Sequence, residues 1–387
     1  MLDNLRPAEK IQSKSKYKPG IEFDGSEGTA VTPGYDSEPE NFDEFLIDAG
    51  LDPDGIEVIP PVRTSRWQQQ KDGELIWLTS YRFTFRKTNA GNNLDLPTLF
   101  AEAKKTKKPS IKTQHTDKAF IVIPADWQVG KVASRGGTKE LMERLFASFD
   151  KIEAQMKAGK YERIVIIDAG DIIESVSNKA NFEQLASNDL SPMQQVDLAA
   201  AMMWELIKRA AKYAPVSYGS VASNHCQNRF NGQTIGKPGL DDWGIVILQQ
   251  LRRLATEVGL DVTFYIPHPD DEGFCLDVFG DEFHILGCWH GHQSGNPDRV
   301  PDYWRNQTFG NQYLTAASIA ITGHFHHTRV QELGQHTNGG SRWWIQASTS
   351  DSGSDWFRRS SGEDSATGIN CFELEKGKHF TGTVYKL

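Results

Sequence analysis

One short stretch of the sequence limits the possible folds more than any other. The apolar run at residues 164–167 is followed at once by Asp168, Gly170 and Asp171. Consecutive apolar residues are typical of a strand that is buried on both faces. In open α/β sheets, the reactive groups lie just beyond the carboxyl ends of such strands. The stretch therefore predicts a buried strand that ends in a functional carboxylate, Asp171.

The same pattern, an apolar run that stops at polar groups, recurs at 119–124, 216–221, 282–288 and 319–322. The polar residues at these junctions are Asp126, Gln128, Asp171, Asn224, His225, His290, His292, His324 and His326. A single histidine or aspartate at a strand end is more often a turn or capping residue than a ligand. An ordered set from five segments instead outlines a metal site.

The chain is predicted to have four parts. Residues 1–40 are rich in Gly, Pro, Ser and charge, so a disordered tail is expected. Residues 41–96 hold a short helical pattern and two strand-like runs joined by Asp-Gly, which predicts a small helix and β-hairpin module. Residues 97–117 form a basic linker. Residues 118–387 alternate strands and helices and then become rich in strands, which predicts an α/β domain of two sheets packed face to face with helices outside.

Composition excludes several classes of protein. The chain is 38% hydrophobic and 24% charged, as in ordinary soluble globular proteins. No apolar run approaches the roughly 20 residues of a membrane helix, and the first residues lack the apolar core of a secretory signal. The four cysteines show no C-x-x-C spacing, which argues against disulfides and a thiolate zinc site. A cytoplasmic protein without membrane contact is therefore expected.

Charge is unevenly distributed along the chain. Residues 61–118 carry 12 Lys and Arg against 5 Asp and Glu, whereas residues 1–60 carry 5 against 14. A local basic segment can bind nucleic-acid phosphate, although such runs often only interact with water. Nucleic acid is the expected partner, and the N-terminal module could alternatively bind a protein.

The residue types at the junctions suit phosphate ester hydrolysis. That reaction needs a deprotonated water, neutralisation of the charge on the phosphoryl oxygens and a proton for the leaving alcohol. Two metal ions about 3.5–4 Å apart supply the first two. A ligand shared by both ions must be a carboxylate, and Asp171 is the best candidate because Gly170 allows a tight turn at the strand end.

The ordered motifs resemble those of the calcineurin-like metallophosphoesterases, whose pattern runs D-x-H, G-D-x-x, G-N-H-D/E, H and G-H-x-H. The match spans residues 119–374 in the same order. Within that superfamily, the motif pattern most resembles double-strand-break-repair nuclease subunits and phage-type metallophosphoesterases. The resemblance implies a two-sheet metallophosphoesterase sandwich and two divalent ions, with Mn²⁺ favoured and Mg²⁺, Fe²⁺ or Zn²⁺ as alternatives.

The resemblance also implies a role for each matched residue. The implied ligands are Asp126, Gln128 and His326 for the first ion, Asp171 for both ions, and Asn224, His290 and His324 for the second ion. His225 would not be a ligand but would protonate the leaving oxygen. Glu174 would orient His225 by a hydrogen bond.

Three positions depart from the family pattern. Gln128 replaces the histidine of D-x-H, Ser223 the glycine of G-N-H, and Cys226 the acidic residue after it. A glutamine oxygen can bind manganese or magnesium, but more weakly than imidazole. His292 is a second candidate beside His290, and His327 is expected to lie outside the site.

Two further features have competing interpretations. Trp356, Arg358 and Arg359 lie in a Ser/Asp/Gly-rich loop and could stack a base and grip phosphate, or could belong to a mobile surface loop. Gly136 and Gly137 precede a predicted helix and could cradle a phosphate, but a tight turn is favoured.

The sequence thus predicts a metallophosphoesterase that hydrolyses phosphodiester bonds, with nucleic acid favoured as substrate, through a dinuclear metal-activated hydroxide. One alternative is a phosphomonoesterase that acts on a protein or a small molecule. Another is a binding module that keeps the fold but has lost turnover through Gln128 and Cys226.

Overall fold

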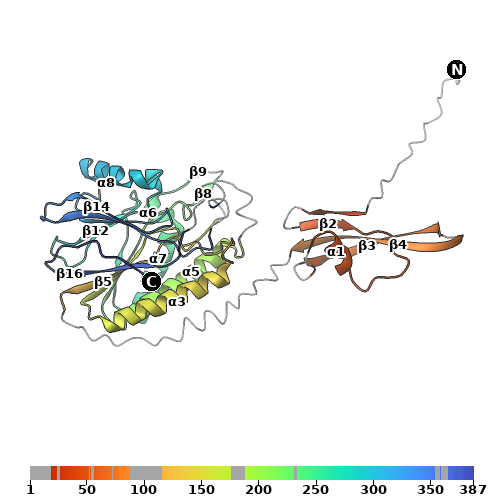
Figure 1. The fold of residues 1–387 in the computed structure, drawn as a ribbon, viewed down its shortest axis with the longest axis horizontal. Helices are drawn as coiled ribbons and strands as arrows, with labels where there is room; N and C mark the ends of the chain where they lie inside the picture. Colours follow the sequence, from red (N-terminus) through yellow and green to blue (C-terminus); the bar gives the residue numbers. More distant parts are fainter. Residues whose placement is uncertain are drawn as a thin grey trace, which may run out of the picture. The chain divides into compact units, whose positions relative to one another are not determined.

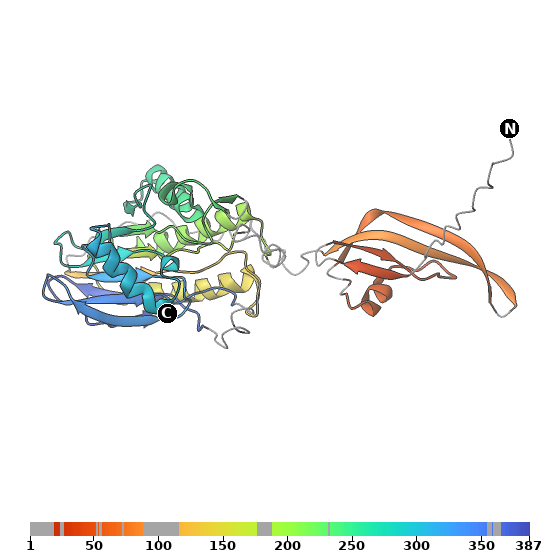
Figure 2. The same ribbon diagram turned by 90° about the horizontal axis from the view of Figure 1, so that it is seen from above.

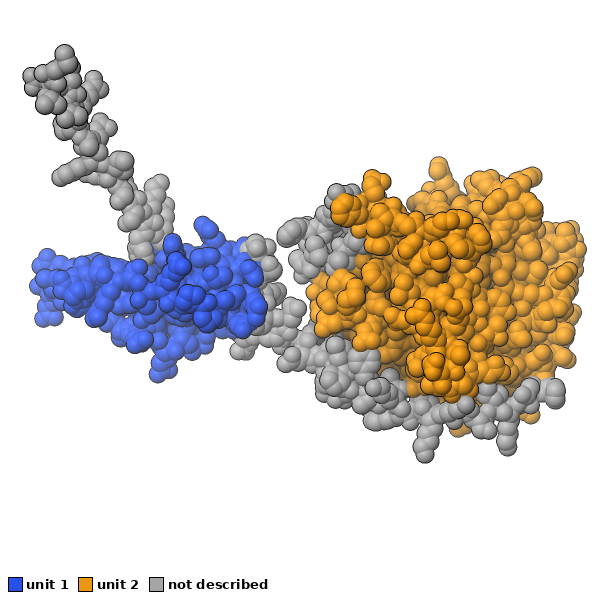
Figure 3. Space-filling model, turned by 180° about the vertical axis from the view of Figure 1, so that it is seen from behind, with its two compact units in different colours: residues 1–93 blue, residues 94–387 orange. Residues whose placement is uncertain are grey.

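The computed structural model describes residues 19–23, 27–51, 53, 56–71, 73–87, 116–175, 188–230, 233–353, 358 and 365–387. The chain forms two compact units, residues 1–93 and residues 94–387, which are coloured separately in Figure 3. Within the described ranges, no helix has the length and apolar character needed to cross a membrane.

The N-terminal unit is a four-stranded antiparallel sheet with one short helix. Its strand order is β1-β2-β4-β3. The elements are β1 (Gly20–Phe23), β2 (Glu27–Val31), α1 (Asp43–Asp48), β3 (Ile56–Lys71) and β4 (Glu74–Lys87). β3 and β4 form the long, curved hairpin seen in Figure 2, with Lys71 paired to Glu74. The hairpin predicted around Asp-Gly is therefore confirmed.

Alternation along β4 explains which face of this sheet carries the core. Tyr81, Phe83 and Phe85 are buried, whereas Arg82 and Arg86 between and after them are exposed. This period of two is typical of a strand with one covered face. The buried rings pack against Phe42 and Phe45, beside and within α1. The helical spacing at 41–50 therefore serves to cover the sheet.

The predicted disordered tail is wrong for residues 20–23 and 27–31, which form β1 and β2. These strands are short and weakly apolar, so their local sequence does not identify them. They become ordered through pairing, because β2 bonds along β4 and inserts Ala30 into the core. Residues 1–18 and most of the predicted linker, 97–115, lie outside the described residues.

The described part of the C-terminal unit contains two large sheets and a two-stranded sheet of β8 (Arg229–Phe230) and β9 (Gln233–Thr234). The first has the order β10-β7-β6-β5-β16-β17 and the second the order β11-β12-β13-β15-β14. The strands of the first sheet are β5 (Lys118–Ile123), β6 (Arg163–Asp168), β7 (Val216–Ser220), β10 (Val262–Tyr265), β16 (Asn370–Glu375) and β17 (Tyr385–Lys386). Those of the second are β11 (Phe274–Asp277), β12 (Ile285–Cys288), β13 (Ile319–Thr322), β14 (Arg329–Gln335) and β15 (Ser341–Gln346).

The central strands of each sheet are parallel, and this decides where the site can form. β5, β6, β7 and β10 run parallel in the first sheet, as do β12, β13 and β15 in the second. The antiparallel strands are β16 and β17 on one side of the first sheet, and β11 and β14 at the two edges of the second. The carboxyl ends of parallel neighbours meet at one edge of a sheet. Residues that follow these strands are therefore brought together.

The two sheets pack face to face, with helices on both outer faces. Every second residue of a central strand points into the core between the sheets. Ile121 of β5 and Val165 of β6 lie there together with Leu286 and Ile321 of the second sheet. The residues between them, such as Phe120, point into the outer core beneath the helices. Burial on both faces explains the continuous apolar runs, and the predicted sandwich with helices outside is confirmed.

The α-helices in the described part of this unit are α3 (Thr138–Ala158), α5 (Pro192–Ala210), α6 (Pro238–Asp241), α7 (Trp243–Val258) and α8 (Val300–Phe309). α3, α5 and α7 supply the core outside the first sheet. α8, which the sequence did not indicate, packs Trp304 against Trp289 and Trp344 outside the second sheet. Figure 1 shows α8 and α3 on opposite sides of the two sheets.

Candidate metal centre

The predicted site residues all follow carboxyl ends of strands. Asp126 and Gln128 follow β5, Asp171 follows β6, and Asn224 and His225 follow β7 in the first sheet. His290 follows β12, and His324 and His326 follow β13 in the second sheet. The site is therefore built from both sheets.

Several residues of this site have left-handed backbone conformations. Eight non-glycine residues in the described ranges have positive φ, and five of them are predicted ligands. These five are Asp126 (49°), Gln128 (47°), Asp171 (52°), His324 (72°) and His326 (62°). Each such residue costs roughly 1–2 kcal/mol. Strain gathered at one place is a sign of function, because a fold otherwise avoids it.

The loops after β5 and β6 hold each other in place. The N–H of Asp126 donates to the Gly170 carbonyl (2.9 Å), and the N–H of Gln128 donates to the Asp171 carbonyl (2.9 Å). The N–H of Glu174 donates to the Val129 carbonyl (3.0 Å). The pairing of the parallel strands thus continues into the site, and the strained residues are fixed by their neighbours.

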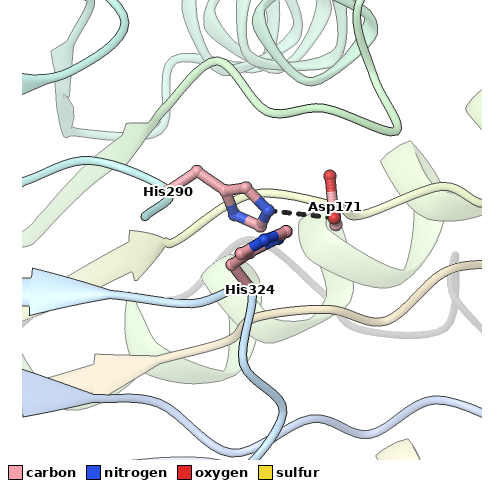
Figure 4. Close-up of side chains that lie close together, drawn as sticks. All are labelled: Asp171, His290 and His324. Carbon is pink, nitrogen blue, oxygen red and sulfur yellow. Dashed lines mark ion pairs between the residues drawn. The ribbon is translucent and has the colours of Figure 1, made fainter. Parts of the chain in front are cut away.

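Three side chains form a possible metal-binding group. The ligand atoms of Asp171, His290 and His324 lie within 4.8 Å of one another, and Figure 4 shows the three groups facing a common point. His290 Nε2 is 2.9 Å from Asp171 Oδ2. The other nitrogen of His290, Nδ1, is 2.7 Å from the Ala169 carbonyl. Since a carbonyl only accepts, Nδ1 carries a hydrogen, and it is Nε2 that faces Asp171.

Charge at this group suits a cation. Burial lowers the pKa of His324 to about 2, with His290 adding to the effect, so His324 is a neutral ring with a free lone pair. Burial lowers the pKa of His290, but the Asp171 carboxylate raises it more, to about 9. The position between His290 and Asp171 therefore attracts either a proton or a metal ion.

Asn224 supplies a fourth candidate ligand. Its Oδ1 is buried and has no hydrogen-bond partner among the described residues. An unpartnered buried acceptor is costly unless a ligand satisfies it. The neighbouring N–H of His225 donates to Asp171 Oδ1 (2.9 Å), which ties this turn to the carboxylate. One carboxylate, one amide oxygen and two imidazoles make a donor set that fits a divalent transition ion.

Ser223 and Asp242 position this half of the site. The N–H of Asp171 donates to Ser223 Oγ (2.8 Å), and the N–H of Ser223 donates to Asp242 Oδ2 (3.0 Å). Asp242 also caps α7 by accepting from the N–H of Gly244 (2.8 Å). The serine that departs from the family pattern thus has a structural role. Asp242 was missed, because its only local signal is that of a helix cap.

His225 and Glu174 are in contact. His225 Nδ1 is 3.0 Å from the Glu174 carbonyl and 3.3 Å from Glu174 Oε2. His225 Nε2 lies 3.9 Å from Asp171 Oδ2. Burial lowers the pKa of His225, but Glu174 and then Asp171 raise it more, to about 9. His225 is therefore protonated at neutral pH and can act as an acid.

The other half of the site has different contacts. Asp126 accepts from the N–H of His324 (2.9 Å to Oδ2), and its Oδ1 lies 3.4 Å from His326 Nε2. His326 Nδ1 lies 3.5 Å from Asp351 Oδ2. Gln128 Oε1 accepts from the Lys131 ammonium (2.6 Å). Burial lowers the pKa of His326, but Asp126 and then Asp351 raise it more, to about 10.

Lys131 and Asp351 were not identified from the sequence. Lys131 Nζ donates to Asp351 Oδ2 (2.7 Å). Asp351 lies in the loop after β15, whose carbonyls at Ser350 and Asp351 accept from Arg144 (3.3 and 3.0 Å). Its position after a buried strand is the same signal that led to Asp171. That signal was weaker because several polar residues separate Asp351 from the end of β15.

The remaining candidates lie at the margin or outside. The His292 ring centroid is 5.5 Å from that of His290, and burial, with His290, lowers its pKa to about 3. His327 is exposed and contacts the Phe325 carbonyl, and Cys226 and Cys288 are buried free thiols. Arg358 is exposed, whereas Trp356 and Arg359 lie outside the described residues.

The glycines before α3 form a turn. Gly136 has φ +92°. The N–H of Gly137 donates to Glu140 Oε2 (2.8 Å), and the N–H of Thr138 donates to Asp189 Oδ2 (2.7 Å). Since side chains of the protein already accept from these groups, the structure favours the tight turn over the phosphate cradle.

Comparisons with known proteins give little further information. No family model matches the sequence, and no curated protein matches it. A solved structure from Streptococcus pneumoniae TIGR4, described as a predicted phosphoesterase, is 10% identical with a TM-score of 0.27 and covers 70% of this chain and 97% of its own. The structure of PhoD is 8% identical with a TM-score of 0.32 and covers 92% of this chain and 83% of its own. Both likenesses are too weak to assign a function.

Proposed function

We propose that this protein hydrolyses phosphodiester bonds with the aid of a divalent metal ion held by Asp171, Asn224, His290 and His324. The observation that carries this proposal is the convergence of these groups from both sheets, with Asp171 and His324 in strained backbone conformations. Manganese is the favoured ion, because a mixed oxygen and nitrogen set suits six-coordination better than the tetrahedral geometry of zinc.

Metal and protein would divide the chemistry between them. A divalent ion in this position would polarise a phosphoryl oxygen and lower the pKa of the attacking water. His225 holds a proton that it can give to the leaving oxygen, and Glu174 fixes its Nδ1 so that Nε2 remains directed toward Asp171. The ion predicted from the sequence at Asp126, Gln128 and His326, the first of the two, is not needed for these steps.

Nucleic acid is the substrate class that we favour. In the N-terminal hairpin, Arg63 and Arg82 are directly opposite each other, and both are exposed. Like charges at such positions repel each other unless an anion lies between them. Arg66 stacks 4.8 Å from the ring of Trp77, which is 48% exposed and could stack on a base. These features support phosphate contacts by this unit.

Hydrolysis tests the proposed chemistry. With manganese, the full chain should cleave bis(p-nitrophenyl) phosphate faster than p-nitrophenyl phosphate, and chelation should abolish cleavage. Faster cleavage of the monoester would instead favour the phosphomonoesterase. Cleavage of neither ester, with manganese bound, would favour a binding module. Equal rates after exhaustive chelation would exclude a metal-dependent reaction.

Salt titration tests the substrate class. The double variant Arg63→Glu/Arg82→Glu should bind single-stranded DNA or RNA more weakly, with a salt slope reduced by about 1.4, because each phosphate contact to a single strand contributes about 0.7. Arg252→Glu/Arg253→Glu on α7 is the matched control, because both residues are exposed and the charge changes equally. Equal slopes for the two variants would exclude this face of the hairpin as the nucleic-acid contact.

A further inference from the structure

A nearly buried ammonium lies where the sequence predicted the first metal ion. Lys131 Nζ is 2.6 Å from Gln128 Oε1 and 2.7 Å from Asp351 Oδ2. The Lys131 side chain is 13% exposed and that of Asp351 only 1%. A charge removed from water at this depth needs fixed partners of opposite charge. Asp351 provides one, and the carboxylates of Glu174 and Asp126 add further attraction.

The predicted ligands of the first ion already have other partners. An ammonium only donates, so the Gln128 amide oxygen faces Lys131. The two ring nitrogens of His326 face two carboxylates, Asp126 at 3.4 Å and Asp351 at 3.5 Å.

The donor set therefore does not fit a second ion. In this half of the site, Gln128 Oε1 and Asp351 Oδ2 already accept from the Lys131 ammonium, whereas Asn224 Oδ1 in the other half has no hydrogen-bond partner among the described residues. A divalent ion that used Gln128 would also have to approach the ammonium that this oxygen already binds. Like-charge repulsion across so short a distance opposes that arrangement.

We propose that the Lys131 ammonium takes the place of the first metal ion, so that the chain binds one divalent ion instead of two. Asp351 and Gln128 hold the ammonium, as ligands would hold an ion. An ammonium has three donors, and these two acceptors take two of them. The third can reach a phosphoryl oxygen, where a fixed positive charge neutralises the charge that develops during reaction. Only this phosphate contact rests on the proposed function.

The number of bound ions tests the proposal directly. Native mass spectrometry of the full chain, equilibrated with manganese, should show one ion per chain. Gln128→His/Lys131→Ser restores an imidazole and removes the ammonium, so this double variant should bind two. Lys208→Met is the matched control, because Lys208 is a similarly buried lysine, 8% exposed, that pairs with Glu205 on α5 at 3.0 Å. It should bind one ion.

Two ions on the unaltered chain would overturn the proposal. If the double variant is folded, as judged by circular dichroism, and still binds one ion, then Lys131 is not the reason that the chain binds a single ion. A second measurement covers the case in which that variant fails to fold. Titration of the manganese-loaded protein with inorganic phosphate should show roughly tenfold weaker binding for Lys131→Met, with partial recovery for Lys131→Arg. Unchanged phosphate affinity for Lys131→Met would exclude the phosphate contact.

These readouts do not need turnover. A chain that binds one ion and phosphate but hydrolyses neither test ester would support the role of Lys131 and refute the proposed hydrolysis. A chain that hydrolyses the diester with two ions bound would support the proposed hydrolysis and refute the role of Lys131.

Discussion

Gly170 permits a very close approach within the candidate metal centre, and Gly170→Ala should weaken metal binding without replacing any ligand. Gly170 has φ +98°, and a Cβ there would lie 2.6 Å from His290 Nδ1 and 2.7 Å from Ser223 Cβ. Both distances are shorter than real Cβ contacts. Neither neighbour can move freely, because His290 Nδ1 is bonded to the Ala169 carbonyl and Ser223 Oγ to the N–H of Asp171.

The expected effect has two parts. A side chain in the left-handed region costs roughly 1–2 kcal/mol of folding free energy. Displacement of His290 from the Ala169 carbonyl should weaken metal binding about 10–100-fold, the usual effect of losing the group that orients a metal-ligating histidine. In free energy this is about 1.4–2.8 kcal/mol.

Gly280→Ala separates the two parts. Gly280 also has positive φ, +71°, but a Cβ there would meet nothing within 4 Å. Urea unfolding of the metal-free proteins should show a loss of stability in both variants, greater for Gly170→Ala. Calorimetric titration with manganese should show weaker binding for Gly170→Ala alone. Manganese affinity unchanged in Gly170→Ala, or reduced equally in both variants, would refute the reasoning.

Two further predictions concern the proposed roles of Asp171 and His225. Asp171→Asn should lose most bound manganese, because it removes the only carboxylate among the four proposed ligands, and tight metal binding in a titration of this variant would contradict that role. His225→Ala should keep its metal but lose turnover by roughly 10²–10⁴-fold, since a general acid contributes about that much. The loss should be smaller for an aryl diester than for an alkyl diester, and equal losses in steady-state assays would exclude protonation of the leaving group.

The sequence predicted the large domain well because its strands have a clear physical signature. Residues such as Phe120 and Ile121 are buried on opposite faces of one strand, so no polar residue interrupts the run. The strand ends were equally clear, because a glycine and a carboxylate follow directly at Gly170 and Asp171. Each junction could be read locally, and their convergence followed from the parallel order of the strands.

What the sequence did not reveal depends on contacts between distant residues. Lys131 and Asp351 are 220 positions apart, and neither has a local pattern that indicates an ion pair. The sequence therefore predicted Gln128 as a weak ligand, without the ammonium that the structure places beside it. The strand β2 was not predicted for a similar reason, because it is stabilised by pairing with β4 and not by its own few apolar residues.

The order of the proposed ligands along the chain has a consequence for folding. Asp171 and Asn224 follow strands of the first sheet, whereas His290 and His324 follow strands of the second. Neither sheet supplies more than two of the four proposed ligands. A growing or unfolded chain therefore has no partial site of useful affinity. An ion that binds only the assembled sandwich stabilises that state over every earlier one. In the proposed site, metal capture would thus be a late event, and a bound ion would link the two sheets after they have packed.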